Sequence, residues 1–356
     1  MENVVNPAFW SGKRVFVTGH TGFKGSWLSL WLQQMGAELT GYALEPNTQP
    51  NLFNIADVGH GMHSVIGDIR DQMHLQQALS ASQPRIVIHL AAQALVGEGY
   101  RDPLGTYATN VQGTANLLEA VRNTPGVQAV VVVTSDKCYE NKEWSWPYRE
   151  NEALGGHDPY SSSKACAELV TAAYRQSFLA TAGIALASAR AGNVFGGGDW
   201  SANRLIPDLL AAFAASRPAQ LRNPAAIRPW QHVLEPLAGY LILAERLVSN
   251  PHLVGAWNFG PGDADCLSTG AIATRMSSLW GGDANWAPET SNFPHEAGLL
   301  RLDSSLAREQ LGWKSRLSLD EALAATISWH KTWLTGANMR DVTLQQINEF
   351  SNHVRV

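Results

Sequence analysis

A strand, a glycine turn and a helix follow one another near the start of the chain, in RVFVTGHTGFKGSWLSLWL. An apolar β-type run leads into Gly19, Gly22 and Gly25, and the residues after them have helical periodicity. In this context Gly19 permits a tight turn, Gly22 lets the backbone approach a pyrophosphate, and Gly25 lets the helix pack against the strand. The helix N-terminus then faces the anion. The feature therefore predicts a dinucleotide site on an α/β sheet.

The remainder of the first half alternates strand-like and helix-like segments. Strands are predicted over residues 14–19, 38–44, 63–68, 85–91, 128–135 and 183–190, and helical periodicity marks 25–36 and 103–122 between them. Such alternation predicts right-handed βαβ units and a doubly wound parallel sheet with helices on both faces. The expected fold class is α/β, a Rossmann domain with a smaller C-terminal substrate-binding lobe.

The pattern changes after about residue 190. Stretches rich in Gly, Pro and Trp alternate with helices predicted near 204–216, 234–248, 267–280, 304–312 and 318–335. We predict a Rossmann domain over residues 1–190 and a smaller lobe over 191–356, with a segment near 230–262 returning to the first domain. GAWNFG at 255–260 is the expected returning strand, so the smaller lobe is expected to be discontinuous.

Charge and cysteine content exclude several kinds of partner. The formal net charge is −5 and there is no Lys/Arg-rich run, which argues against nucleic acid. Cys138, Cys166 and Cys266 have neither metal-ligand nor disulfide spacing, so no metal is expected and a reducing compartment is favoured. The N-terminus lacks signal-peptide features, and no apolar run approaches the ~18 residues of a membrane helix. The chain is expected to be cytoplasmic, with no membrane partner.

The second predicted strand bears on which dinucleotide is bound. An acidic residue is expected there to hold the ribose, and the strand ends in GYALEP. Glu45 either reaches a ribose hydroxyl or is a solvated loop charge. No arginine stands there to take a 2′-phosphate, so NAD is favoured over NADP. Asp68, after the third strand, could accept a hydrogen bond from the adenine amino group.

Two further groups of residues are candidates for catalysis. Tyr160 and Lys164 are four residues apart in a helical stretch and so share a face, where the lysine could lower the pKa of the phenol and also bind a ribose. In VVVTSDKCYE, residues 131–140, a core strand ends in Ser135, Asp136 and Lys137. Either Ser135 and Asp136 cap the end of the strand and Lys137 is exposed, or the three residues take part in catalysis.

Eight stretches together resemble the extended short-chain dehydrogenase/reductases that act on nucleotide sugars, over roughly residues 12–335: TGHTGFKG, GDIRD, HLAAQ, TNVQGT, TSD, YSSSK, RAGNVFGGG and RPWQHVLE. The resemblance implies that the backbone around Thr21–Phe23 holds the pyrophosphate of NAD, and that Ser135 hydrogen-bonds the sugar 4-hydroxyl and Tyr160. It also implies that Asp68 and Ile69 flank the adenine and that Asn110 orders the active-site helix. The far side of the cofactor would be lined by Leu90, Ala91 and Gln93.

Within this family, Asp136 and Lys137 resemble the acid–base groups of the 4,6-dehydratases. The implied reaction oxidises C4, with Tyr160 taking the hydroxyl proton and NAD⁺ the hydride. Water then leaves across C5–C6 with Asp136 as the acid, and the hydride returns to C6. The dTDP-glucose enzymes have Asp-Glu at these positions. Lys137 at the second position resembles the CDP-sugar enzymes instead. This lysine either takes the C5 proton or stays charged and stabilises the enolate.

The expected substrate is therefore CDP-D-glucose, and the expected 4-keto-6-deoxy product would feed deoxysugar synthesis for polysaccharides of the O-antigen type. The alternatives are a dehydratase or 4-epimerase acting on another nucleotide hexose, and a catalytically silent NAD-binding protein. The silent protein is disfavoured because Ser135, Tyr160 and Lys164 are all present.

The C-terminal lobe offers donors for a diphosphate between residues 190 and 228: Arg190, Asn193, Arg204, Arg222 and Arg228. The resemblance favours Asn193 and Arg228 for the pyrophosphate, with Arg204 and Arg222 nearby. We interpret His232 and His295 as structural residues or as residues that support the groups in contact with the ligand. The helices predicted at 104–122 and 158–176 resemble the dimer-forming pair of the family, so a homodimer or a dimer of dimers is expected.

Overall fold

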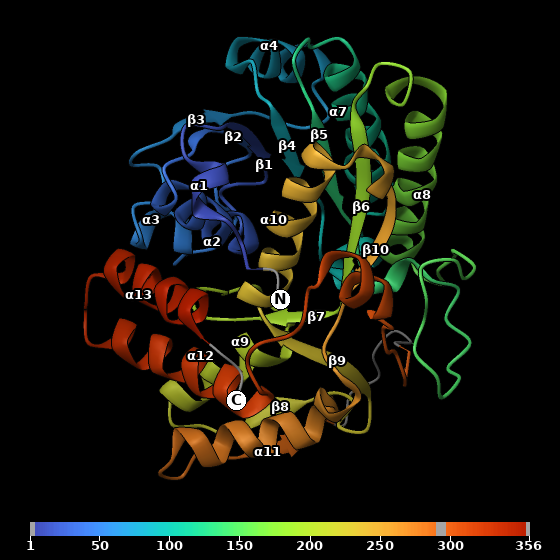
Figure 1. Cartoon of the computed structure of the whole chain (residues 1–356). Coiled ribbons are helices and arrows are strands. Elements are labelled where there is room, and N and C mark those ends of the chain that lie inside the picture. The colour runs from blue at the N-terminus through green and yellow to red at the C-terminus, as the bar shows by residue number, and fades with distance from the viewer. Residues whose placement is uncertain (1–3, 290–296, 354–356) are drawn as a thin grey trace.

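A seven-stranded parallel sheet forms the centre of the computed structural model, which describes residues 4–289 and 297–353 (Figure 1). Its strands are β1 (Arg14–Thr18), β2 (Glu38–Ala43), β3 (His63–Ile66), β4 (Ile86–His89), β5 (Ala129–Val133), β6 (Ala185–Ala191) and β10 (Gly255–Phe259). They are ordered β10-β6-β5-β4-β1-β2-β3, and every neighbouring pair is parallel. The strand order reverses between β1 and β4, where doubly wound sheets bind ligands at the carboxyl ends of the strands.

The predicted fold class is confirmed, and all six strands predicted in the first half are present. GAWNFG contributes β10, which pairs with β6 and extends the same sheet. The division of the chain into two domains near residue 190 stays a prediction.

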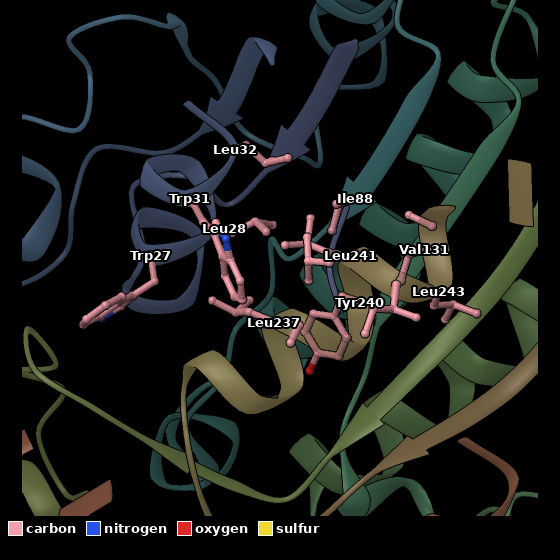
Figure 2. Close-up of a cluster of buried hydrophobic side chains, with 14 of the residues drawn as sticks. Trp27, Leu28, Trp31, Leu32, Ile88, Val131, Leu237, Tyr240, Leu241 and Leu243 are labelled. Atoms are coloured by element: carbon pink, nitrogen blue, oxygen red, sulfur yellow. The ribbon is translucent and has the colours of Figure 1, made fainter. Parts of the chain in front are cut away.

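Helices cover both faces of the sheet. On one face lie α2 (Phe23–Gln34) and α10 (Leu234–Ser249); on the other lie α4 (Gln72–Ser82), α7 (Gly113–Arg122) and α8 (Pro159–Tyr174). Side chains of β5 alternate between the two cores, with Val131 on the α2/α10 side and Val130 on the other. Figure 2 shows the first core, where Trp27 and Leu28 of α2 lie with Leu241 of α10 beside the sheet.

A smaller lobe packs below the carboxyl ends of the central strands (Figure 1). It contains the three-stranded sheet of β7 (Asn193–Phe195), β9 (Ile227–His232) and β11 (Cys266–Ser268), and the pair β8 (Ala219–Leu221) and β12 (Trp286–Pro288). Helices α9 (Leu205–Ala214), α11 (Thr269–Trp280) and α12 (Leu319–Leu334) surround a core of their own. Two of the stretches rich in Gly, Pro and Trp, GNVFGGGDW and RNPAAIRPWQH, supply β7 and β9.

The predicted helix at 103–122 is three joined segments: α6 (Pro103–Tyr107), the π-helix η1 (Ala108–Gln112) and α7. The helix predicted at 304–312 is largely the π-helix η6 (Ala307–Leu311). Helix α13 (Met339–Asn352), which packs on α2, was not predicted from the sequence. His295 lies outside the described residues. Among the helices of residues 4–289 and 297–353, none is both long and apolar enough to cross a bilayer.

The remaining short helices connect these elements. They are α1 (Pro7–Trp10), α3 (Leu52–Ile55), α5 (Val96–Arg101), η2 (Asp136–Cys138), η3 (Arg175–Leu179), η4 (Pro251–Leu253) and η5 (Asp263–Asp265).

Candidate active site

The glycine turn between β1 and α2 has the tight geometry that its spacing predicts. Gly19 has a φ of +78°, and a Cβ there would lie 2.7 Å from the backbone nitrogen of Ala91. A side chain is therefore excluded by conformation and by space. A Cβ on Gly25 would overlap the carbonyl oxygen of Gly19, so the first turn of α2 packs directly on the turn.

The N-terminus of α2 is open to an anion. Gly22 is the N-cap, and in the described part of the chain no side chain caps it. The backbone N–H groups of the first turn therefore keep their hydrogen-bonding capacity. Thr21 Oγ1 donates to Leu44 O at 2.8 Å, which ties the turn to the end of β2. Phe23, the first helical residue, is half-buried. These features fit a pyrophosphate, and the structure holds them at the point where the strand order reverses.

The predicted adenine site lies after β3. Arg70 grips both carboxylate oxygens of Asp68, with Nε–Oδ1 and Nε–Oδ2 distances of 3.0 and 2.9 Å. Hydrogen bonds from Arg70 hold the pKa of Asp68 below its ordinary value. Ile69 is buried against Gly113. Glu45 is exposed at the end of β2, so its two alternatives stay open.

The loop after β4 is fixed by two polar links. The backbone N–H groups of Leu90 and Ala91 both donate to Thr18 Oγ1 at 3.2 Å. Farther along, Asn110 Oδ1 accepts from Gln93 N at 2.8 Å, while Asn110 Nδ2 donates to Gln93 O at 2.9 Å.

Asn110 also reaches α8. Its Nδ2 donates to Ser163 Oγ at 2.8 Å, so this buried amide joins the loop after β4 to the helix that carries Tyr160 and Lys164. The residue lies within η1, and π-helical turns are frequent at functional sites.

The segment after β5 brings three predicted catalytic residues to the carboxyl end of the sheet. Ser135 is extended (φ −159°) and caps η2, where its Oγ accepts from Lys137 N at 3.2 Å and donates to Asp136 Oδ1 at 3.0 Å. Asp136 is buried, and its Oδ2 has no hydrogen-bond partner within the described residues. Burial raises the pKa of Asp136, against the opposing charge of Lys137. Lys137 itself is half-buried.

Tyr160 faces this segment from the first turn of α8. Asp158 caps the helix by accepting from Ser161 N at 2.9 Å. Burial raises the pKa of Tyr160 to about 12, while a hydrogen bond with Ser135 and the charge of Arg204 act to lower it. The buried Lys164 directs its Nζ to the carbonyl oxygen of Val133, 3.4 Å away.

The effect of Lys164 on the pKa of Tyr160 stays a prediction, because the net pKa of the phenol rises in this structure. Desolvation of the phenol dominates, and the cation that opposes it is Arg204. Burial also lowers the pKa of Lys164, to about 8, against the charge of Glu168. The helical spacing correctly placed both residues on one face, but it carried no information on burial.

Two residues near the site were missed from sequence. Burial lowers the pKa of Lys24 to about 7, reinforced by Arg204 and Lys164 and opposed by Asp136 and Asp199. Its place inside TGFKG, at the N-terminus of the cradle helix, is a signal that could have identified it. Tyr240 of α10 is fully buried, and its hydroxyl has no partner in the described part of the chain. Burial and the charges of Tyr160 and Asp136 raise the pKa of Tyr240, and no local motif signals this residue.

The predicted diphosphate donors do not all converge. Arg204 reaches from the smaller lobe to the loop after β4, with Nη1 3.2 Å from Asp199 Oδ2 and Nη2 3.5 Å from Ala94 O. Arg228 is buried on β9, donates to Ile227 O at 2.9 Å and also to Ala297 O, and acts electrostatically on Asp136.

The other candidates are placed differently. Asn193 is half-buried on β7. Arg222 is exposed and donates to Asn203 O at 2.8 Å. Arg190 is buried in an ion pair with Glu168, with Nη2 2.8 Å from Oε2, and so is not available to a diphosphate. His232 is buried with its ring against Trp27 and Phe195, as expected of a structural histidine.

Comparison with known proteins agrees with this geometry. The model of the NAD dependent epimerase/dehydratase family matches residues 15–260. The CDP-glucose 4,6-dehydratase of Salmonella typhimurium (strain LT2) is 52% identical over 353 residues, which cover 98% of each chain.

Two solved structures share the fold. One is a UDP-glucose-4-epimerase from Stenotrophomonas maltophila with bound NAD, at 22% identity and a TM-score of 0.79 over 91% of this chain and 100% of that one. The other is the dTDP-glucose 4,6-dehydratase DesIV from Streptomyces venezuelae, at 23% identity and a TM-score of 0.77 over 89% and 97%. With its parallel sheet, open glycine turn and matching sequence, the chain belongs to the NAD dependent epimerase/dehydratase family.

Proposed function

We propose that this protein is an NAD-dependent 4,6-dehydratase that converts CDP-D-glucose to CDP-4-keto-6-deoxy-D-glucose. The observation that carries the proposal is the buried Ser135-Asp136 pair beside Tyr160, followed by Lys137, in a chain 52% identical to a CDP-glucose 4,6-dehydratase. Exchange of the hydroxyl configuration at C4 needs a base at that hydroxyl. Loss of water from C5 and C6 needs a further acid and base, and the segment after β5 supplies candidates for both.

The residues present fit NAD. Glycines stand where a Cβ would fill the cradle, and the first turn of α2 keeps its N–H groups open to a pyrophosphate. NAD⁺ bound by these residues would supply both a hydride acceptor and, once reduced, a hydride donor, so the reaction would have no net redox change. The proposed contacts are the backbone around Thr21–Phe23, then Asp68, Ile69, Leu90, Ala91 and Gln93, with Tyr160 and Lys164 at the nicotinamide end.

Tyr160 is proposed to take the proton of the 4-hydroxyl. Its hydrogen bond with Ser135 places a second hydroxyl beside the same substrate oxygen and favours the phenolate. The charge of Arg204 acts in the same direction. The 4-keto group formed in this way acidifies the hydrogen on C5.

Asp136 is proposed to protonate the departing 6-hydroxyl. Burial raises its pKa, which favours the protonated acid, and no hydrogen-bond partner for its Oδ2 lies among the residues that the structure describes. Lys137 either takes the C5 proton or stabilises the enolate as a cation, and we favour the first role. Arg228, Arg204 and Asn193 are proposed to hold the diphosphate, with the exposed Arg222 at its edge.

Assembly and location are part of the same proposal. Leu104 on α6 is 81% exposed and Leu169 on α8 is 58% exposed, which is unusual for large apolar side chains and supports a homodimer or a dimer of dimers through these helices. Light scattering after size-exclusion chromatography measures this directly. We place the enzyme in the cytoplasm, supplying deoxysugar for polysaccharides of the O-antigen type.

The function is tested by incubating the purified protein with NAD⁺ and CDP-glucose, dTDP-glucose, UDP-glucose or GDP-mannose. The 4-keto-6-deoxy product absorbs in base, and we expect it with CDP-glucose. A 4-epimer without a keto product would identify an epimerase instead. A 4-keto-6-deoxy product formed from another sugar nucleotide would contradict the proposed substrate but support the proposed reaction.

A further inference from the structure

Glu168 and Arg190 form an ion pair buried between α8 and the sheet. Arg190 Nη2 lies 2.8 Å from Glu168 Oε2, and the two side chains are 4% and 3% exposed. Ser188 Oγ donates to the same carboxylate oxygen at 2.6 Å. Ser188 and Arg190 alternate along β6 with alanines that face the other core, so both polar side chains point toward α8.

Such a pair is costly to bury, because both charges lose water. Burial alone would raise the pKa of Glu168, but Arg190 and the hydroxyl donors outweigh it and hold the pKa below its ordinary value. A buried ion pair of this kind is weak evidence for stability, so a role other than stabilisation is considered. The remaining contacts of Glu168 and Arg190 indicate such a role.

Each partner holds one end of segment 134–139. At the first end, Thr134 Oγ1 donates to Glu168 Oε1. At the other, Arg190 Nη1 donates to Tyr139 Oη at 2.8 Å, and its guanidinium lies 4.9 Å from the centroid of that ring. Between these two ends lie the three residues proposed above as catalytic, followed by Cys138.

Helix α8 connects this ion pair to the rest of the site, because Glu168 lies on the same helix as Tyr160 and Lys164. Tyr160, Lys164 and Glu168 recur every four residues and therefore lie on one face of the helix. Lys164 Nζ donates to Val133 O, the residue just before Thr134. The end of β5 is thus tied to this helix face by two adjacent residues.

We infer that Glu168 and Arg190 are positioning residues that clamp segment 134–139 at both ends, so that Ser135 and Asp136 stay in register with Tyr160. Neither acts on the reacting atoms. The clamp fixes the distance between two groups of catalytic residues that come from different elements, and a misplacement of about 1 Å can cost on the order of 100-fold in rate. The catalytic part of this inference rests on the proposed function.

The test cuts each end of the clamp and leaves the ion pair in place. Thr134→Val removes the upstream donor, and Tyr139→Phe removes the downstream hydroxyl. Thr134→Ser restores the donor and is the rescue variant. Matched controls lie on α8 itself: Thr171→Val removes a buried hydroxyl that donates to Ala167 O at 2.7 Å, and Tyr174→Phe removes one that lies 3.4 Å from Glu119 Oε2.

Two readouts are measured for every variant. The first is hydrogen exchange of the backbone amides of 134–139 in the protein without substrate, which reports local opening and needs no turnover. The second is kcat and KM for CDP-glucose with NAD⁺. We expect Thr134→Val and Tyr139→Phe to exchange this segment faster and to lose kcat about 10- to 100-fold at little-changed KM. Thr134→Ser and both controls should resemble the wild type.

The inference is overturned if segment exchange in Thr134→Val and Tyr139→Phe stays within twofold of the wild type, or if Thr171→Val and Tyr174→Phe show the same acceleration. A clamp seen by exchange with unchanged kcat would overturn the positioning role. If the wild type turns over none of the nucleotide sugars, the proposed function fails, and the exchange data still decide whether the clamp exists.

Discussion

Lys164 and Glu168 lie one turn apart on the buried face of α8 and reach consecutive residues at the end of β5, Val133 and Thr134. Glu168 is neutralised by Arg190, so the lysine is left as a buried cation whose carboxylate neighbour is already paired. Burial accordingly lowers the pKa of Lys164 to about 8, despite the opposing charges of Glu168 and Cys138. The site therefore holds a charge that the fold does not fully compensate.

Replacing this lysine should stabilise the fold and stop the reaction. At pH 7 a buried Lys164 ammonium has lost its water, so Lys164→Met should raise the free energy of unfolding by about 1–3 kcal/mol. Between pH 8 and 10.5 the unfolded chain binds more protons at this residue than the folded chain, so the stability of the wild type rises with pH. The difference in free energy of unfolding between the variant and the wild type therefore becomes smaller. Urea unfolding of both proteins across this pH range measures that difference. A variant less stable than the wild type at pH 7 would contradict the expectation.

Asp136→Asn should separate the two halves of the proposed reaction. The amide cannot donate an acidic proton to the 6-hydroxyl, so we expect kcat for the keto product to fall by about 10²–10⁴-fold. Oxidation at C4 depends on Ser135 and Tyr160 and should survive. Reduced nicotinamide should then accumulate in rapid mixing with CDP-glucose, seen by its absorbance. Equal loss of both steps would argue that Asp136 only supports the local fold.

Local pattern was sufficient to predict the sheet and the cradle. The strands of the first half have short apolar runs, and the glycine turn depends on residues close in sequence, so Gly19 and Gly25 were identified with their geometric reasons. α13 was missed because its residues are mostly polar and it buries only a narrow face, of which Ile347 and Phe350 form part.

Tertiary burial accounts for the errors at the site. Arg190 was counted among the possible diphosphate donors because arginine suits that ligand, but its partner Glu168 lies on a different element, and the pairing is seen only when β6 packs against α8. The alternation of Ser188 and Arg190 with alanines was the available signal. The sequence suggested only that Lys164 could lower the pKa of Tyr160; the net rise of that pKa comes mainly from desolvation, which depends on the whole environment and not on a neighbour one turn away.

Glu235 predicts a second pH dependence of stability, with the opposite sign. Its Oε1 accepts from Arg316 N and Leu317 N at 2.8 and 2.7 Å, yet burial raises its pKa to about 7. Between pH 4.5 and 7 the folded chain binds more protons here than the unfolded chain, so this contribution to stability is lost as pH rises through 7.

Glu235→Gln removes that dependence while keeping an acceptor. We expect the variant to be more stable than the wild type by about 1–3 kcal/mol at pH 8, and to lose this advantage below pH 5. Thermal unfolding at the two pH values provides the comparison. An advantage that is the same at both would show that the carboxyl group does not titrate differently on folding.

Gly25→Ala tests the cradle against a control in the same chain. The added Cβ would overlap Gly19 O, so either α2 or the turn must move, at a cost of about 1–3 kcal/mol or more. Since the N-terminus of α2 is the proposed pyrophosphate site, NAD⁺ affinity measured by titration calorimetry should fall at least tenfold. Gly97→Ala adds the same methyl group to α5, where it meets no atom within 4 Å apart from its chain neighbours and the backbone of its own helix, and should not lower stability or change NAD⁺ affinity. If Gly25→Ala bound NAD⁺ as well as Gly97→Ala does, the cofactor would have to be held elsewhere than at this helix.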